Sequence, residues 1–212
     1  MTDIRPLRRD AQRNRDLLVA AAGRIFAARG LDVPLEDVAR EAGVSIGTLY
    51  NRFPTRGALV DATLADKVAE TVEYAQAAAT MADPWSGFAW FLEHTCALQA
   101  ADRGYNELCA RALPDAPEID RLKARGHELV TTIIDRAQAS GQLRPDFHDG
   151  DFAFVLWSTA TIIEATATTA PDAWRRHLAF MLDGLRAGAA HPLPGRALEP
   201  DEVAKAMRML GD

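Results

Sequence analysis

Apolar residues recur along this chain at intervals of three and four positions, which is the spacing of one face of an α-helix. One such face is formed by Leu17, Leu18, Ala21, Ala22, Ile25 and Phe26. Gly30 follows it, and glycine is common just beyond a helix end because it readily adopts the left-handed conformation found there. Runs of alternating β-branched and polar residues between tight turns, which would predict strands, are nearly absent. The pattern therefore predicts an all-α protein.

Breaker residues divide the rest of the chain into helices of different length. After the first helix, the pattern predicts helices at about residues 35–42, 45–53, 55–79, 118–140, 150–169, 172–188 and 201–210. One or two further helices are expected between residues 83 and 113, and loops are expected at 141–149 and 190–200. Pro54 ends the helix at 45–53, because proline disfavours the helical conformation in the residue before it.

Residues 38–53, with the sequence VAREAGVSIGTLYNRF, predict two short helices joined by a tight turn. Gly43 supplies the left-handed conformation that the turn requires, and Ser45 is placed to cap the second helix. Leu49 and Phe53 lie four residues apart, so both can face inward. The exposed remainder is rich in hydrogen-bonding groups, which suits a helix that reads a DNA groove better than one that builds a core.

On these residues the sequence resembles the TetR/AcrR family of bacterial regulators. The matching features, in chain order, are Phe26, Gly30-Leu31, VAREAGVS (38–45), GTLYNRF (47–53), Pro54, Arg56 and Leu59. They cover roughly residues 12–70. The resemblance implies a three-helix helix-turn-helix DNA-binding head with a basic N-terminal arm at residues 1–56 and a helical ligand-binding and dimerisation body at 57–212. The helix from about residue 55 would connect the two.

The resemblance also implies which residues meet DNA. The DNA-binding residues expected from it are Ser45, Ile46, Gly47, Thr48, Tyr50, Asn51, Arg52 and Arg56. Ser45 and Tyr50 match positions that contact phosphates, and Arg56 matches a phosphate contact at the start of the following helix. Thr48 and Asn51 match positions that read or adjoin bases. Phosphate contacts would set the register on DNA, whereas base contacts would carry the sequence preference.

The charge distribution changes the first impression given by the net charge of −6, which argues against nucleic acid. Residues 1–56 hold 10 arginines and 7 acidic residues, whereas the rest of the chain holds 14 basic and 23 acidic residues. A cationic end on an acidic body fits a DNA-binding head. Ile46 departs from the family pattern, which often has lysine there; this either removes one phosphate contact or replaces it with an apolar contact, such as one to a thymine methyl. Either a DNA-touching arm or a solvated tail is formed by Arg5, Arg8, Arg9, Arg13 and Arg15.

The predicted helix around residues 85–98 carries large apolar groups on more than one face, so it is buried on several sides or lines a cavity. The candidate residues for a small apolar ligand are Trp85, Phe88, Phe91, His94, Cys109 and Trp157. His94 would orient the ligand, unless it is a core histidine with its hydrogen bonds satisfied. Metal binding by His94 with Cys96 is disfavoured, because residues two apart point away from each other on a helix. We therefore expect no metal and no cofactor.

The last two long predicted helices carry the apolar positions expected to form a homodimer. These positions are Phe152, Leu156, Ile163, Trp174, Leu178, Met181 and Leu185. Gly184 and Gly188 would allow close helix approach; packing within one subunit is the alternative. A symmetric dimer would bind a palindromic operator with its two Thr48 residues about 34–36 Å apart or somewhat more. Glu164 stands inside an apolar stretch and must be paired, protonated, pocket-facing or solvent-facing.

Composition argues against several other protein classes. A hydrophobic content of 48% allows a full core, and no run of 18 apolar residues predicts a membrane span. The N-terminal arginines precede no apolar stretch of signal-peptide type, and two cysteines give no disulfide framework, so a reduced cytoplasmic protein is expected. No triad of catalytic residues, phosphate-binding loop or metal-ligand spacing favours an enzyme.

The sequence thus predicts a DNA-binding transcriptional regulator. We expect a homodimeric repressor that binds double-stranded operator DNA and is released by a small apolar ligand. A helical scaffold or binding protein without DNA binding is the first alternative, and an enzyme is the second.

Overall fold

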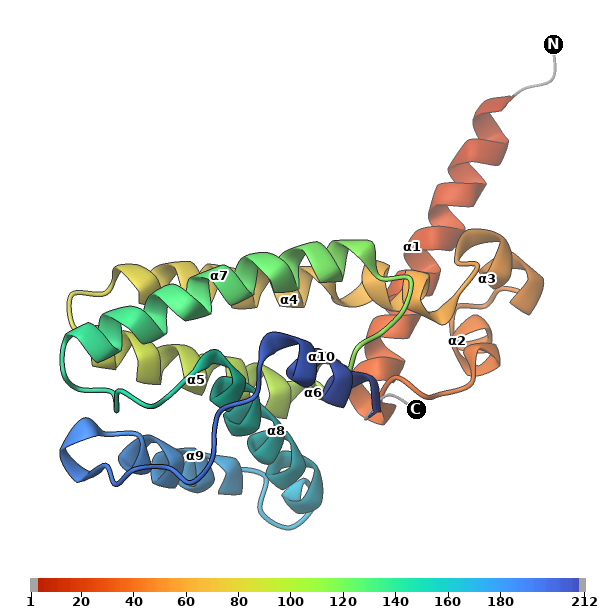
Figure 1. The fold of residues 1–212 in the computed structure, drawn as a ribbon. Coiled ribbons are helices and arrows are strands. Elements are labelled where there is room, and N and C mark those ends of the chain that lie inside the picture. Colours follow the sequence, from red (N-terminus) through yellow and green to blue (C-terminus); the bar gives the residue numbers. More distant parts are fainter. Residues whose placement is uncertain (1–3, 210–212) are drawn as a thin grey trace.

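The structure, a computed structural model, describes residues 4–209 (Figure 1). Its α-helices are α1 (Ile4–Arg29), α2 (Leu35–Glu41), α3 (Ile46–Arg52), α4 (Arg56–Thr80), α5 (Pro84–Ala101), α6 (Arg103–Ala110), α7 (Pro117–Ala139), α8 (Asp149–Thr166), α9 (Ala173–Gly184) and α10 (Pro200–Met209). A short 3-10 helix spans Ala187–Ala189. Over these residues the only β-type pairing is an isolated bridge between Leu143 and Arg186. The prediction of an all-α protein is confirmed.

The head consists of α1, α2 and α3 packed around a small apolar core. Phe26 of α1, Val38 of α2 and Leu49 of α3 are fully buried there. Gly43 has a φ of +68° in the turn between α2 and α3, as the turn requires. Phe53 leaves the helical conformation with a φ of −132°, directly before Pro54. The two short helices therefore lie within a residue or two of their expected positions.

The first helix is longer than its apolar face suggested. In Figure 1 the start of α1, in red, projects away from the rest of the head. The side chains of Arg13 and Arg15 are exposed. The guanidinium of Arg15 lies 5.5 Å from the centre of the Phe53 ring, so this arginine also packs against the head. The side chains of Arg5, Arg8 and Arg9 lie outside the described residues.

The body is a helical bundle built on α4, which leaves the head and runs along α7 and α5 (Figure 1). On the other side of the body, α8 packs against α9. The short helix α6 touches α1 of the head as well as α5 and α8 of the body. The last helix, α10, folds back against α8. None of the described helices is both long enough and apolar enough to cross a membrane.

Two helices, α5 and α6, occupy the region in which the sequence left one or two open. Asp102 separates them, because its carboxylate caps α6 by accepting a hydrogen bond from the Tyr105 N–H at 2.9 Å. This carboxylate is 2% exposed and pairs with Lys67 of α4 at 3.2 Å. The break between the helices is therefore held in place by the helix packed beside it.

The ninth helix ends at Gly184, four residues before its expected end. The chain leaves the helix there because the carbonyl of Leu185 accepts a hydrogen bond from the Arg144 N–H at 3.0 Å. The Ala187 N–H then donates to the Gln142 carbonyl at 2.9 Å. These bonds tie the end of α9 to the loop before α8, and a longer helix could not make them.

Candidate nucleic-acid interface and ligand cavity

The helix α3 is capped and anchored by the residues that the sequence indicated. The Ser45 hydroxyl accepts a hydrogen bond from the Thr48 N–H at 3.1 Å and lies 2.9 Å from the Thr48 hydroxyl. Leu49 is fully buried and Phe53 is 3% exposed, so both hold the helix against α1 and α2. The cap and these two anchors fix which face of α3 remains free.

The free face of α3 carries hydrogen-bonding groups. Tyr50 is 48% exposed although it is large and largely apolar, and Asn51 and Arg52 beside it are exposed. Ser45 and Gly47 are exposed at the helix start, whereas Ile46 and Thr48 are half-buried. A Cβ at Gly47 would meet only the Ser45 hydroxyl, at 3.9 Å, so packing within the chain does not require glycine there. An open helix start of this kind allows close approach of a partner.

Arg56 is placed differently from the other expected DNA-binding residues. It is half-buried, and its Nη1 donates hydrogen bonds to the Leu31 carbonyl and, at 2.8 Å, to the Val33 carbonyl. The side chain thus holds the turn between α1 and α2 against the start of α4. This role within the head uses Nη1, so the expected phosphate contact would have to use the Nη2 or Nε donors and stays a prediction.

The body encloses a cavity of about 390 Å³, which lies in the lower part of the range of roughly 300–1,000 Å³ typical of small-molecule sites. Six helices contribute to its wall. Most of the lining is apolar, including Val68, Val72, Phe91, Leu108, Leu122, Val130, Phe152, Leu156, Trp157, Val203 and Met207. Its size and apolar wall suit a small, largely hydrophobic molecule.

Polar groups interrupt this wall at several points. The hydroxyls of Thr71 and Tyr105 form a hydrogen bond with each other. Lys123 donates from Nζ to the Leu108 carbonyl at 2.9 Å, and Asp149 lies 3.7 Å from His127. Burial raises the pKa of the Cys109 thiol to about 11, so this lining group is neutral at pH 7.

Thr95 is the most isolated of the polar lining groups. It is 2% exposed, and its hydroxyl has no hydrogen-bond partner among the described residues. A buried hydroxyl without a partner costs free energy. A ligand with a polar atom at this point would relieve that cost.

Residues 18–63 match the bacterial regulatory proteins of the tetR family, and residues 83–187 match the C-terminal domain of SbtR-like transcriptional regulators. The crystal structure of the TetR transcriptional regulator SCO0520 from Streptomyces coelicolor shares 31% identity with a TM-score of 0.52. That alignment covers 81% of this chain and 98% of the other. The chain belongs to the TetR family. It is a DNA-binding, ligand-responsive transcriptional regulator.

Two further proteins extend the similarity of this TetR-family chain. It is 25% identical over 187 residues to the HTH-type transcriptional repressor KstR2 of Mycolicibacterium smegmatis, over 81% of this chain and 90% of that protein. The structure of the regulator FadR from Bacillus subtilis, in complex with stearoyl-CoA, shares the fold with a TM-score of 0.62 and 16% identity. That match covers 82% of this chain and 98% of FadR.

Within the TetR-family body, the expected ligand residues divide into two groups. Phe91, Cys109 and Trp157 line the cavity. Trp85 and Phe88 do not; they pack in the core beside each other, with ring centres 5.6 Å apart. Their helix is apolar nearly all round, so the sequence could not show which face meets the cavity and which the core.

His94 also lies away from the cavity wall. Its Nδ1 lies 2.8 Å from the Trp90 carbonyl oxygen. The centre of its ring lies 3.9 Å from that of the tilted Trp90 ring and 5.3 Å from that of Tyr74, which it meets edge-on. The structure therefore gives His94 the alternative role of a histidine with partners inside the subunit. Sequence reasoning missed Lys123 and Tyr105, since a charged residue on α7 and a tyrosine on a short helix carried no cavity signal.

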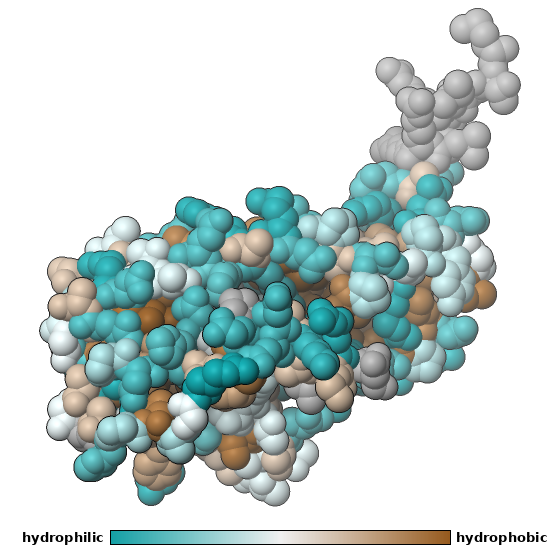
Figure 2. Space-filling view, viewed as in Figure 1, coloured by the Kyte–Doolittle hydropathy of each residue, from teal (hydrophilic) through white to brown (hydrophobic). Residues whose placement is uncertain are grey.

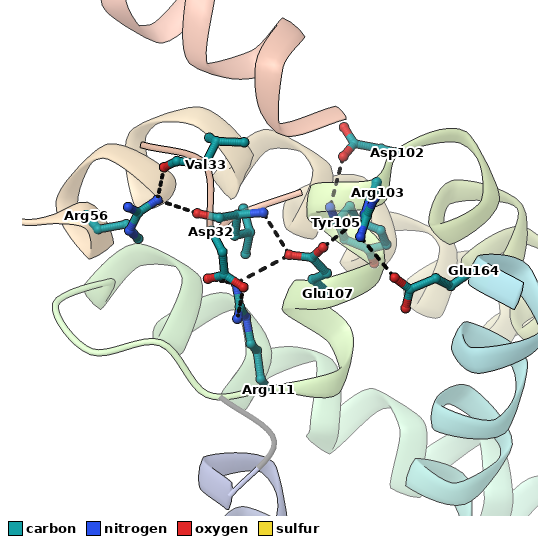
Figure 3. A network of polar contacts seen from close by, with 10 residues as sticks. Asp32, Val33, Arg56, Asp102, Arg103, Tyr105, Glu107, Arg111 and Glu164 are labelled. Atoms are coloured by element: carbon teal, nitrogen blue, oxygen red, sulfur yellow. Dashed lines mark hydrogen bonds and ion pairs between the residues drawn. The ribbon is translucent and has the colours of Figure 1, made fainter. Parts of the chain in front are cut away.

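One side of α6 faces the head, as Figure 3 shows for Glu107. The other side lines the cavity. Glu107 accepts a hydrogen bond from the Leu31 N–H at 2.7 Å, in the turn between α1 and α2. Gly30 precedes that turn with a φ of +83°, and a Cβ there would lie 2.0 Å from a carboxylate oxygen of Glu107. Glycine is therefore required for this approach. Tyr105 and Cys109 of the same helix line the cavity, so a single short helix touches both functional regions.

Two ion pairs extend this network toward α8. Arg103 of α6 contacts Glu107 at 3.2 Å and Glu164 of α8 at 2.9 Å. Glu164 is 59% exposed, so its place in an apolar stretch is explained by pairing at the surface. It does not line the cavity.

The residues expected at a dimer interface are mostly occupied inside the subunit. Trp174 and Leu178 are 2% and 3% exposed, and Ile163 and Leu185 are each 9% exposed. Phe152 and Leu156 line the cavity, and Met181 is half-buried. The large apolar groups that α8 and α9 leave exposed are instead Phe154 at 43% and Phe180 at 60%. The apolar positions named from the sequence therefore pack mostly within the subunit, and the dimer interface on these helices stays a prediction.

Proposed function

We propose that this regulator is a repressor that binds a palindromic operator as a homodimer and is released when an apolar ligand enters the body cavity. The observation that carries the proposal is the position of α6, which contacts the α1–α2 turn through Glu107 and lines the cavity through Cys109. A ligand that favours a different position of α6 would change the position of the head. Such coupling requires that the ligand bind the two arrangements with different affinity.

The proposed DNA contacts lie on and before α3. Ser45 and Tyr50 contact phosphates, while Thr48 and Asn51 lie where a recognition helix in the major groove meets base edges. Gly47 lets the helix start approach the DNA backbone, and Ile46 meets an apolar group such as a thymine methyl. Arg52 adds positive charge at the end of the same helix. Because α3 is one and a half to two turns long, two copies about one DNA turn apart are needed to specify an operator.

The proposed dimer forms through the outer faces of α8 and α9, with a second copy of this chain as the partner. Phe154 and Phe180 supply exposed aromatic groups on these helices, and Gly184 is exposed with open space around its Cβ position. A two-fold axis would pair the same two helices of each copy in a four-helix bundle. Arg176 lies next to Phe180, with its guanidinium 4.8 Å from the centre of the ring.

The dimer is tested by sedimentation of the intact protein and of Phe180→Asp. We expect a dimer for the wild-type chain and a shift toward monomer for the variant, because the substitution places a carboxylate in an apolar interface. Met209→Asp is the matched control, since Met209 is 72% exposed and lies on α10, which is not part of the proposed interface. A monomeric wild-type protein, or equal behaviour of both variants, would contradict this interface.

We propose that the regulator acts in the cytoplasm. The repressor function is tested by mobility shifts on DNA from upstream of the regulator's own gene, which is where a repressor that regulates its own gene binds. We expect a salt-dependent complex with protection of two half-sites about one turn apart. Addition of an apolar compound that binds the body should then weaken this complex. If none of the bound compounds releases the DNA, the protein binds DNA but lacks the proposed switch. If the protein forms no complex with any palindromic DNA, the proposed repressor function is refuted.

A further inference from the structure

Lys123 brings a positive charge to the cavity wall without an opposite charge beside it. No ion pair between the described residues includes it. Its partners are the carbonyl oxygens of Leu108 at 2.9 Å and of Arg111 at 3.4 Å, at the end of α6. An ammonium group has three N–H donors, so two bonds to carbonyls leave one donor free of a described protein acceptor.

None of the neighbouring described groups forms an ion pair with this charge. The Cys109 thiol lies close to Lys123 but is neutral, because burial raises its pKa to about 11. Tyr105 is also neutral, since burial raises the pKa of its hydroxyl well above the ordinary value of 10.0. Asp120 on the same helix is exposed and forms no ion pair with Lys123.

Asp149 is the acidic group on the cavity wall, and it has other partners. Its Oδ2 accepts a hydrogen bond from the Thr131 hydroxyl at 2.8 Å and lies 3.7 Å from His127 Nε2. A buried charge that is not paired is costly, and burial accordingly lowers the pKa of Lys123. Within the part of the chain that the structure describes, Lys123 is therefore a cation on an apolar cavity wall that has no acidic partner.

We propose that the ligand of this regulator is an apolar carboxylic acid whose carboxylate pairs with Lys123. Its apolar part fills the space between Val72 of α4, Leu156 of α8 and Met207 of α10. The unpartnered hydroxyl of Thr95 marks a second point on the wall where a polar atom of the ligand is accepted. This inference rests on the proposed ligand-responsive function and adds the chemical class of the ligand.

The test compares acids with uncharged molecules of the same shape. Isothermal titration of the intact protein uses straight-chain carboxylates of six to fourteen carbons, the alcohols of equal length and the methyl esters. A hydrogen bond to a charged group contributes about 1.5–3 kcal/mol, so we expect the best carboxylate to bind at least roughly tenfold more tightly than its alcohol. Equal binding, tighter binding of the alcohols, or no binding across the whole series overturns the proposal.

Substitutions then assign the preference to one side chain. Lys123→Gln removes the charge and keeps a hydrogen-bond donor, so the acid and alcohol should bind with nearly equal affinity. Lys205→Gln is the matched control, because Lys205 is exposed on α10 and does not line the cavity. An acid preference that survives in Lys123→Gln overturns the assignment. If this variant does not fold, as judged by thermal unfolding and operator binding, the comparison of acid and alcohol on the wild-type protein decides.

Operator binding separates this inference from the proposed function. A carboxylate that binds through Lys123 without releasing the operator supports the ligand class and refutes the proposed switch. An uncharged alcohol that binds as well as the acid and releases the operator supports the proposed switch and refutes the ligand class. The two proposals therefore fail by different measurements.

Discussion

Arg111, directly after α6, forms two parallel hydrogen bonds of 3.0 Å each with the carboxylate of Asp32 in the turn between α1 and α2. The two residues are 79 positions apart in the chain, and they join the body to the head. The pairing holds the pKa of Asp32 below its ordinary value of 3.8, with the Arg111 hydrogen bond as the largest cause. The backbone carbonyl of Arg111 also accepts a hydrogen bond from Lys123 on the cavity wall, at 3.4 Å. Arg111 thus contacts both the head and a residue of the cavity wall.

Asp32→Asn should reduce the effect of a bound ligand on operator affinity. The substitution removes the ionic link between the α1–α2 turn and Arg111, and coupling between two sites depends on contacts of this kind. Typical coupling free energies between two sites are about 1–3 kcal/mol, which corresponds to roughly 5–150-fold in affinity. We therefore expect the ratio of operator Kd with and without ligand to fall several-fold. The ratio is measured by fluorescence anisotropy of labelled operator.

Asp37→Asn is the matched control for this coupling. Asp37 also has a lowered pKa, caused mainly by its hydrogen bond with Arg29, but both of its partners, Arg29 and Arg40, belong to the head. It should leave the ratio unchanged. Equal loss of coupling in both variants would show that the head was weakened generally, against the role assigned to Asp32.

Tyr50→Ala should weaken DNA binding on every sequence, whereas Thr48 and Asn51 substitutions should change which sequence is preferred. A phosphate contact adds affinity without sequence information, while loss of a base contact costs about 1–3 kcal/mol at one base pair. Binding to the operator and to single-base variants of each half-site measures both effects. A Tyr50→Ala protein with altered sequence preference but unchanged affinity would reverse these assignments.

Met207→Asp should weaken ligand binding, because α10 closes part of the cavity wall. Val203, Ala204 and Met207 line the cavity, and the Met207 carbonyl accepts a hydrogen bond from the Ala112 N–H at 3.3 Å. In the space-filling view, hydrophilic side chains predominate on the face where α10 lies, which fits an amphipathic helix with its apolar side turned inward (Figure 2). A lost methionine contact of about 1.5–3 kcal/mol corresponds to roughly tenfold or more in Kd.

Met209→Asp serves as the comparison for α10. Met209 is two residues further on the same helix and is 72% exposed, so its substitution should not change ligand affinity. Operator binding without ligand should be unchanged in both variants. Equal ligand affinity in Met207→Asp and the wild-type protein would mean that α10 is not part of the binding site.

The C-terminal segment should loosen at acidic pH. Arg144 lowers the pKa of Asp146 to about 2, and the same carboxylate accepts a hydrogen bond from the Leu193 N–H at 3.2 Å. A carboxyl group with a lowered pKa stabilises the fold above its unfolded value of 3.8, and this contribution is lost as the pH falls toward about 2. The protection factor of the Leu193 N–H, which is the intrinsic exchange rate at each pH divided by the observed rate, should therefore fall over that pH range.

Asp146→Asn should show fast exchange at Leu193 already at pH 7. Asp135→Asn is the control, since Asp135 is exposed on α7 and has no hydrogen bond to the C-terminal segment. A protection factor at Leu193 that is independent of pH between 5 and 2 in the wild-type protein would assign the attachment of this segment to other contacts, such as that between Arg144 and the His191 carbonyl.

Features that depend on neighbours in the chain were determined by the sequence alone. The Ser45 cap, the turn at Gly43 and the end of α3 before Pro54 follow from local conformational preferences and hydrogen bonds within one helical turn. The inward face of α3 follows from the spacing of Leu49 and Phe53. The family motifs lie in this same segment, so the DNA-binding function could be predicted with it.

Features that depend on distant segments were decided by the tertiary structure. Helix α5 is apolar nearly all round, so only packing could place Phe91 on the cavity and Phe88 in the core. Arg56 matches a phosphate-contacting position of the family, but only the tertiary structure shows that its Nη1 donates hydrogen bonds to carbonyls of the α1–α2 turn. The sequence around Lys123 gives no sign that it is anything but a surface lysine, yet its ammonium group donates to a carbonyl near the end of α6, beside the cavity. Periodicity shows that a residue is covered or charged, but its partner is set by which helices pack together.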